Sequence, residues 1–222
     1  MNRAVFLDRD GTLNEMVFNP EHGVFDSPFT PEQLVLKRGA ASFVAALNRA
    51  GFKVIVVTNQ PGCAKGTMTE ERLRAIHERF LSELGREGAR VHGVYYCPHH
   101  PTGALGGDAR LVGVCECRKP KPGLLVRAAP EHEIDLRASF MVGDGTVDVE
   151  AGRAAGVTTV LVAPRKPELM AFLEGRPESV PDIWVESLEA ALHDILSRGR
   201  LEQSVCARNP SVPDEGGRWR SS

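Results

Sequence analysis

Short, mostly apolar segments recur along this chain, and segments with helical periodicity lie between them. Residues 4–7 (Ala-Val-Phe-Leu) and 53–58 (Lys-Val-Ile-Val-Val-Thr) are two such runs, and a helix is predicted between them at 39–50. Strands that are buried on both faces are apolar without alternation, which is typical of a parallel sheet covered by helices. The pattern therefore predicts an α/β fold whose strands are joined by right-handed crossovers.

The alternation continues toward the C-terminus. We predict further strands at 91–96, 139–143, 158–162 and 183–185, and further helices at 69–84, 124–129, 147–155 and 188–196. Two long segments, 14–38 and 97–118, follow predicted strands and interrupt the alternation. Because long loops inside a compact domain are usually functional, we expect both beside the active edge of the sheet. Residues 1–198 form the predicted domain, and the polar, aperiodic segment 199–222 is expected to be a disordered tail.

Composition excludes several classes of protein. The net charge of −2 argues against nucleic-acid binding, which usually requires a basic excess. The apolar runs are too short for a signal peptide or a membrane helix, so we expect a cytoplasmic protein without a membrane partner. Five cysteines, an odd number, argue against a disulfide framework and in favour of a metal site or free thiols.

Two carboxylates follow the first apolar run directly. Residues i and i+2 of a strand point to the same side, so Asp8 and Asp10 converge just past the strand's carboxyl end. In open α/β sheets this is where ligands bind. One carboxylate could attack a substrate while the other moves a proton. Taken alone, the segment could equally be a polar turn that closes a strand.

Three later segments place further polar groups after predicted strands or loops. Thr58 and Asn59 offer a hydroxyl and an amide that suit phosphate oxygens, and Arg118 and Lys119 add two cations. Asp144 follows another apolar run and could join Asp8 in binding Mg²⁺, which prefers oxygen ligands. Each segment alone has a simpler explanation, as a helix cap, a strand end or a solvated surface.

Together these segments resemble the haloacid dehalogenase (HAD) superfamily of phosphatases. The resemblance covers roughly residues 3–196 and rests on the motifs Asp8-x-Asp10-Gly11-Thr12, Thr58-Asn59, Lys119 and Gly143-Asp144-x-x-x-Asp148. It implies a Rossmann-like parallel sheet flanked by helices, without a large cap domain.

The resemblance also implies the role of each residue. Asp8 would be the nucleophile and Asp10 the general acid and base. Thr58 and Lys119 would bind the phosphoryl group. The catalytic Mg²⁺ would be held by Asp8, by the backbone carbonyl of Asp10 and by Asp144.

The cysteines predict a second metal site. Cys97, His99, Cys115 and Cys117 supply three thiols and one imidazole, a set that makes a closed tetrahedral Zn²⁺ site. His99 is preferred to His100 because the Cys-x-His spacing lets two ligands straddle a proline. A site with four protein ligands is structural, so zinc should pin the loop 97–118. The alternative is free reduced cysteines beside surface histidines.

The Cys/His pattern is similar to the zinc-containing, nearly capless branch of the superfamily. That branch includes D-glycero-D-manno-heptose 1,7-bisphosphate 7-phosphatases and histidinol-phosphate phosphatases. The gap between His99 and Cys115 is more like the heptose enzymes, in which the arginine matching Arg118 contributes to substrate recognition. We therefore expect a phosphorylated small-molecule substrate and a monomeric enzyme. Histidinol phosphate, another sugar or polyol phosphate, phosphoryl transfer, and a zinc-stabilised interaction module without catalysis remain alternatives.

Overall fold

Six parallel strands form one sheet in the computed structural model, which describes residues 1–20 and 23–208. The strand order is β5-β4-β1-β6-β7-β8, and every neighbouring pair is parallel. The strands are β1 (Ala4–Leu7), β4 (Lys53–Asn59), β5 (Gly93–Cys97), β6 (Phe140–Gly143), β7 (Thr158–Val162) and β8 (Ile183–Val185). The predicted parallel α/β sheet is therefore confirmed.

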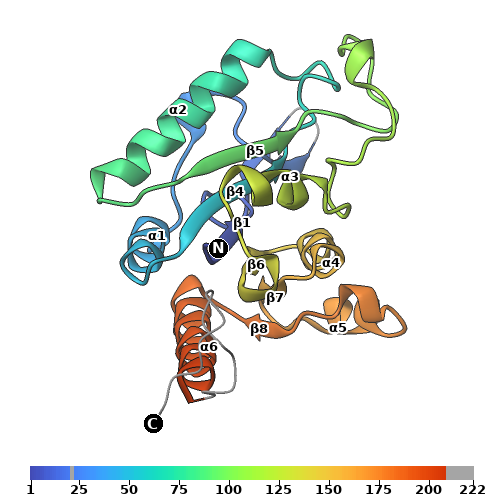
Figure 1. Cartoon of the computed structure of the whole chain (residues 1–222). Coiled ribbons are helices and arrows are strands. Elements are labelled where there is room, and N and C mark those ends of the chain that lie inside the picture. The colour runs from blue at the N-terminus through green and yellow to red at the C-terminus, as the bar shows by residue number, and fades with distance from the viewer. Residues whose placement is uncertain (21–22, 209–222) are drawn as a thin grey trace.

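Helices cover both faces of this sheet (Figure 1). In β1, Val5 and Leu7 pack in one core cluster, and Ala4 and Phe6 pack in the other, because successive side chains point to opposite faces. The first face carries α1 (Ala40–Arg49), α2 (Glu70–Arg86) and α6 (Leu188–Arg208). The second face carries α3 (Gly123–Glu131) and α4 (Thr146–Ala155), and α5 (Pro167–Leu173) precedes β8.

The direction in which the sheet grows reverses at β1. The chain passes from β1 through β4 to β5 on one side, and then from β6 through β7 to β8 on the other. Such a switch point leaves a crevice at the carboxyl ends of the central strands, because the crossovers on its two sides run in opposite directions. Asp8, which follows β1, therefore lies at the position where this fold binds ligands.

The segment 14–38 contains regular structure that the sequence analysis did not predict. β2 (Val17–Asn19) and β3 (Val24–Asp26) form an antiparallel pair, and a short 3-10 helix follows at Pro31–Gln33. The rings of Phe18 and Phe25 pack edge to face at 5.4 Å between centroids. Strands of three residues are too short to show a periodicity, so this part of the chain resembled an irregular loop.

The C-terminal helix is longer than expected. Helix α6 continues to Arg208, past the predicted domain boundary at residue 198, and the rest of the expected tail, 209–222, lies outside the described residues. None of the helices in the described part of the chain is long and apolar enough to cross a membrane.

Candidate active site

A cavity of about 260 Å³ opens at the carboxyl ends of the central strands. Its residues come from five separate parts of the chain: the turn after β1, the hairpin β2–β3 with its flanking residues, the end of β4, the loop before α3, and the start of α4. The lining residues are Asp8, Asp10, Met16, Asp26, Ser27, Thr58, Asn59, Lys119, Asp144, Gly145, Val147 and Asp148.

Lys119 is the charged centre of this cavity. Its ammonium lies 2.6 Å from Asp8 Oδ1 and 2.6 Å from Asp148 Oδ1, and it donates to the carbonyl of Val57 at 2.8 Å. The side chain is only 2% exposed. Although burial works against a charged ammonium, the carboxylates of Asp148 and Asp8 raise the pKa of Lys119. The lysine is therefore a fixed positive charge beside the predicted nucleophile.

The carboxylates around Lys119 outnumber it. Burial raises the pKa of Asp8 to about 7, although the lysine acts in the opposite direction. Partial burial and the charge of Asp8 raise the pKa of Asp144 to about 6, while one side of Asp144 stays open to solvent. Carboxylate oxygens of Asp8, Asp144 and Asp148 lie within 4.8 Å of one another. This excess of negative charge and these oxygen ligands fit a hard divalent cation such as Mg²⁺.

Gly11 allows the turn after β1 to approach Asp144. Its φ is +83°, and a Cβ atom placed there would lie 2.1 Å from Asp144 Oδ2. Any larger residue would therefore have to displace the carboxylate. The Nζ atom of Lys37 donates to the Gly11 carbonyl, and its charge partly offsets the rise in the pKa of Asp144. Gly11 thus allows the turn that follows Asp8 to lie against Asp144.

Two of the predicted substrate-binding residues make contacts that the sequence did not indicate. The side-chain amide of Asn59 donates to the carbonyl of Lys119 and accepts from its backbone N–H, both at 3.1 Å. Asn59 therefore fixes the backbone of the lysine. Arg118 does not line the cavity; its guanidinium donates to the carbonyl of His99 at 3.3 Å.

Sequence reasoning assigned no role to Asp148 or Gln60. Asp148 is paired with Lys119, and its spacing of four residues after Asp144, one helical turn along α4, was the available signal. Gln60 is 2% exposed and donates to Asp10 Oδ2 at 2.5 Å. Nothing in the local sequence distinguishes it from a polar residue of a turn.

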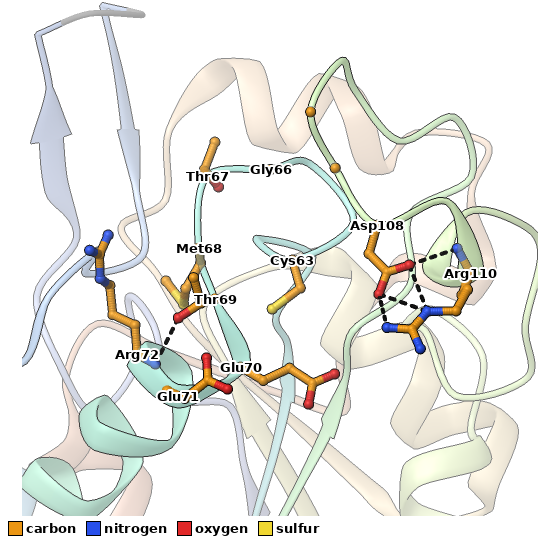
Figure 2. Close-up of a pocket in the computed structure, with 12 residues that line it drawn as sticks. Cys63, Gly66, Thr67, Met68, Thr69, Glu70, Glu71, Arg72, Asp108 and Arg110 are labelled. Carbon is orange, nitrogen blue, oxygen red and sulfur yellow. Dashed lines mark hydrogen bonds and ion pairs between the residues drawn. The ribbon is translucent and has the colours of Figure 1, made fainter.

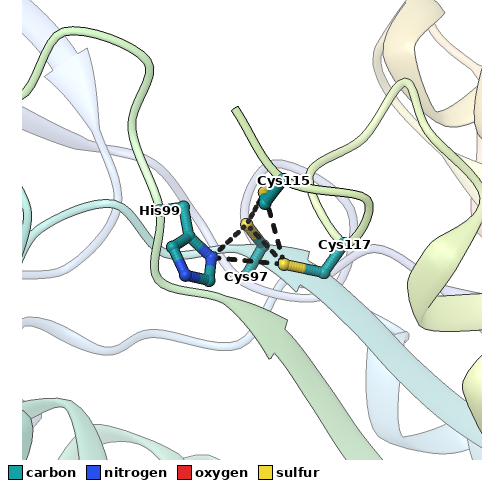
Figure 3. A group of neighbouring side chains, drawn as sticks. All are labelled: Cys97, His99, Cys115 and Cys117. Carbon is teal, nitrogen blue, oxygen red and sulfur yellow. Dashed lines mark hydrogen bonds between the residues drawn. The ribbon is translucent and has the colours of Figure 1, made fainter. Parts of the chain in front are cut away.

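Cys97, His99, Cys115 and Cys117 converge on one point (Figure 3). Their three Sγ atoms are 3.2–3.5 Å apart, and His99 Nδ1 is 3.3 Å from Cys117 Sγ and 3.7 Å from Cys97 Sγ. Tetrahedral ligands with Zn–S bonds of about 2.3 Å would lie about 3.8 Å apart. The described cysteines form no disulfide, and the four donor atoms fit a closed zinc site.

The loop 97–118, which carries the Cys/His cluster, packs on the loop that follows β4. A Cβ atom on Gly66 would lie 2.7 Å from the backbone of Gly106, and one on Gly107 would lie 2.0 Å from the carbonyl oxygen of Ala64. The N–H of Asp108 also donates to the carbonyl of Cys63 at 3.0 Å. The loop carrying the Cys/His cluster is therefore attached to the segment that continues from Thr58.

A hollow of about 560 Å³ lies beside this loop contact (Figure 2). In Figure 2, Cys63 and the first turn of α2 face Asp108, which holds Arg110 through an ion pair of 2.6 Å. The side-chain oxygen of Thr69 caps the helix by accepting from the N–H of Arg72 at 3.2 Å. The hollow is separate from the cavity that contains Asp8.

Comparison with known proteins agrees with this geometry. The family model HAD-hydrolase-like matches residues 116–191. D-glycero-beta-D-manno-heptose-1,7-bisphosphate 7-phosphatase of Rhodopseudomonas palustris is 44% identical over 154 residues, covering 69% of this chain and 79% of that protein. The chain belongs to the HAD family of phosphatases. The enzyme of the same name from Escherichia coli K12 is 40% identical over 165 residues, covering 74% of this chain and 81% of its own.

Solved structures show the same fold for this HAD phosphatase. The D,D-heptose 1,7-bisphosphate phosphatase of B. bronchiseptica superimposes with a TM-score of 0.70 and 29% sequence identity. The match covers 88% of this chain and 99% of the other, which was solved in complex with magnesium and phosphate. The chain is therefore a phosphoric monoester hydrolase, and the alternative of an interaction module without catalysis is set aside.

Proposed function

We propose that this phosphatase removes the 7-phosphate of D-glycero-D-manno-heptose 1,7-bisphosphate through an aspartyl-phosphate intermediate on Asp8. The observation that carries the chemistry is the buried 2.6 Å contact between Asp8 and Lys119, in a cavity that Asp10 and Asp144 also line. Relatives that are named for this reaction and are 40–44% identical to the chain support the substrate.

Asp8 and Lys119 share the first step. A phosphate monoester is anionic and repels a carboxylate, and the ammonium of Lys119 reduces this repulsion. The hydroxyl of Thr58, which is buried at the end of β4 and lines the cavity, would donate to a phosphoryl oxygen. A carboxylate oxygen of Asp8 then attacks phosphorus, and the bond between phosphorus and the sugar oxygen breaks.

Asp144, Asp8 and the backbone carbonyl of Asp10 would hold Mg²⁺, which HAD phosphatases use. When bound, the ion would neutralise charge on the phosphoryl oxygens. The excess of negative charge around Lys119 supports this assignment, because a divalent cation would offset it. The magnesium and phosphate found together in the B. bronchiseptica enzyme also support it.

Asp10 moves the protons in both steps. As the phosphorus–oxygen bond breaks, Asp10 gives its proton to the departing sugar oxygen. It then takes a proton from the water molecule whose oxygen attacks phosphorus. The bond between Asp8 and phosphorus breaks, inorganic phosphate leaves, and Asp10 is protonated again for the next cycle.

Zinc, held by Cys97, His99, Cys115 and Cys117, would have a structural role. A site with four protein ligands leaves no position for substrate, so the ion would stabilise the loop rather than react. The last ligand immediately precedes Arg118 and Lys119 in the chain. A zinc ion held there would therefore help to keep the lysine beside Asp8.

Arg118 would recognise the phosphate that is not cleaved. It is half-buried and follows the last zinc ligand, so its guanidinium is carried by a restrained loop. Asp26 and Ser27 of the hairpin line the cavity itself and would contact sugar hydroxyls. We also propose a cytoplasmic monomer that acts on this small molecule without a nucleic-acid or membrane partner; fractionation and size-exclusion chromatography test these points.

A comparison of substrates tests the proposed function. The specificity constant should be measured for both anomers of the heptose bisphosphate, for a heptose monophosphate, and for histidinol phosphate. Arg118→Ala should lower the value for the bisphosphate roughly 10- to 150-fold, as expected for one charge-assisted contact of about 1.5–3 kcal/mol. It should leave the monophosphate almost unchanged.

Arg110→Ala is the matched control, because Arg110 lies in the same loop but is exposed and paired with Asp108. It should not change the preference between substrates. Asp8→Asn should abolish turnover with all of them while the fold survives, because an amide does not form the intermediate. Preference for histidinol phosphate, or equal losses on bisphosphate and monophosphate with Arg118→Ala, would contradict the assigned substrate.

A further inference from the structure

Both carboxyl oxygens of Asp10 are held by nitrogen donors. Oδ1 accepts from Arg9 Nε and from Asn14 Nδ2, each at 3.0 Å. Oδ2 accepts from Arg9 Nη2 at 2.9 Å and from Gln60 Nε2 at 2.5 Å. Because both oxygens accept hydrogen bonds, the carboxyl group is held in one orientation about its Cβ–Cγ bond.

The three donor residues are themselves fixed by burial. Arg9 and Asn14 are fully buried, and Gln60 is 2% exposed. The Gln60 side chain also donates to Thr58 Oγ1 at 2.9 Å, and its backbone N–H donates to the carbonyl of Cys97 at 2.8 Å. The Gln60 side chain therefore cannot move aside into solvent without breaking its bond to Thr58.

The three donor residues connect Asp10 to different parts of the chain. Arg9 is the adjacent residue and Asn14 lies in the same turn, so both fix the carboxyl relative to its own segment of backbone. Gln60 directly follows β4, and one amide nitrogen bonds both Asp10 and Thr58. It therefore fixes the distance between the carboxyl group of Asp10 and the hydroxyl group of Thr58.

We propose that Gln60 is a positioning residue that holds Asp10 at the leaving-group oxygen. This inference rests on the proposed role of Asp10 as general acid and base. A catalytic group displaced by about 1 Å can lose roughly 100-fold in rate, and general acid–base catalysis contributes about 10²- to 10⁴-fold. Loss of the Gln60 donor should therefore affect proton transfer more than phosphoryl binding.

The leaving group separates these two effects. A sugar alkoxide needs a proton to depart, whereas 4-nitrophenolate departs without one. The specificity constant reports the steps up to formation of the phosphorylated Asp8. Gln60→Leu, which removes the donor at similar volume, should lower this constant about 10- to 100-fold for the sugar phosphate that the wild-type enzyme hydrolyses best. The constant for 4-nitrophenyl phosphate should fall by less than about threefold.

Hydrolysis of the intermediate still needs Asp10 as a base, whatever group has left. Gln60→Leu should therefore release a burst of 4-nitrophenol stoichiometric with enzyme, followed by slow turnover. Gln60→Met, an unbranched side chain that also lacks the donor, should behave alike, and circular dichroism of both variants checks the fold. Gln60→Asn, which keeps the amide, should recover part of the activity.

Asp10→Asn is the reference variant. It should show the same dependence on the leaving group, in a stronger form. If Asp10→Asn loses activity equally on both substrates, the proposed role of Asp10 is wrong and the inference falls with it. If Asp10→Asn is selective but folded Gln60→Leu and Gln60→Met lose activity equally on both substrates, or not at all, only the role of Gln60 is refuted.

Discussion

Removal of the Lys119 ammonium should strongly destabilise the protein. In Lys119→Met, the carboxylates of Asp8 and Asp148 would face each other without the cation that lies 2.6 Å from each. The three side chains are 2%, 10% and 3% exposed, so water cannot replace the lost charge. Breaking a buried ion pair by removing one partner costs about 3–5 kcal/mol. Because one ammonium pairs with both carboxylates, we expect Lys119→Met to lower the free energy of unfolding by about 3–5 kcal/mol in total.

The chain contains a matched control two residues away. Lys121 pairs with Glu116 at 2.7 Å, but their side chains are 39% and 85% exposed. Exposed pairs contribute about 0–1 kcal/mol, so Lys121→Met should be nearly neutral. Urea unfolding of wild type and both variants, in buffer without added magnesium, measures the two free-energy differences under identical conditions.

The cost of Lys119→Met should also depend on pH. Burial already raises the pKa of Asp8 to about 7 and raises that of Asp148, and loss of the ammonium would raise both further. A carboxyl whose folded pKa exceeds its unfolded value of about 4 binds its proton more tightly in the folded state. Below about pH 7 Asp8 destabilises wild type and variant to the same extent, so the cost of Lys119→Met grows only as the pH rises from there toward the higher folded pKa of the variant.

The free-energy difference should accordingly be larger at about pH 8.5 than at about pH 5.5. A Lys119→Met variant within about 1 kcal/mol of wild type at both values would refute this account of the buried charges. A cost that does not change with pH would show that lost packing, rather than unpaired carboxylates, is responsible.

Three further predictions concern the surroundings of the site. Elemental analysis should find about one zinc ion per chain in wild type and less in Cys117→Ser. The variant should also lose melting temperature and activity, since zinc would restrain the loop of Lys119. Zinc-free but fully active wild-type protein would contradict this. Gly107→Ala should cost about 1–3 kcal/mol in urea unfolding because its Cβ would meet the Ala64 carbonyl at 2.0 Å, whereas Gly88→Ala, where nothing lies within 4 Å, tests only the positive φ. Burial lowers the pKa of His77 to about 4, so on acidification the unfolded chain binds a proton at His77 before the folded protein does. The free energy of unfolding should therefore fall between pH 6.5 and about 4. Replacing His77 with Gln should remove this part of the pH dependence.

Much of the fold and the identity of the acidic groups could be predicted from the sequence. Apolar runs without alternation indicate parallel strands, and the carboxyl ends of such strands meet at one edge of the sheet. Asp8, Asp10, Thr58 and Asp144 each stand at or just past a strand end, so the same rule brings them together. The convergence of Cys97, His99, Cys115 and Cys117 could likewise be predicted, because paired cysteines and histidine indicate a shared metal before any contact is known.

Only the tertiary structure decided which partner each of these side chains has. The amide of Asn59 bonds the backbone of Lys119, whereas its neighbour Gln60 bonds Asp10, and the local sequence does not distinguish them. Likewise, Asp148 pairs with Lys119, although the two lie in different segments of the chain. Strand ends follow from local periodicity, but hydrogen-bond partners depend on the register and packing of segments distant in sequence, which no local pattern encodes.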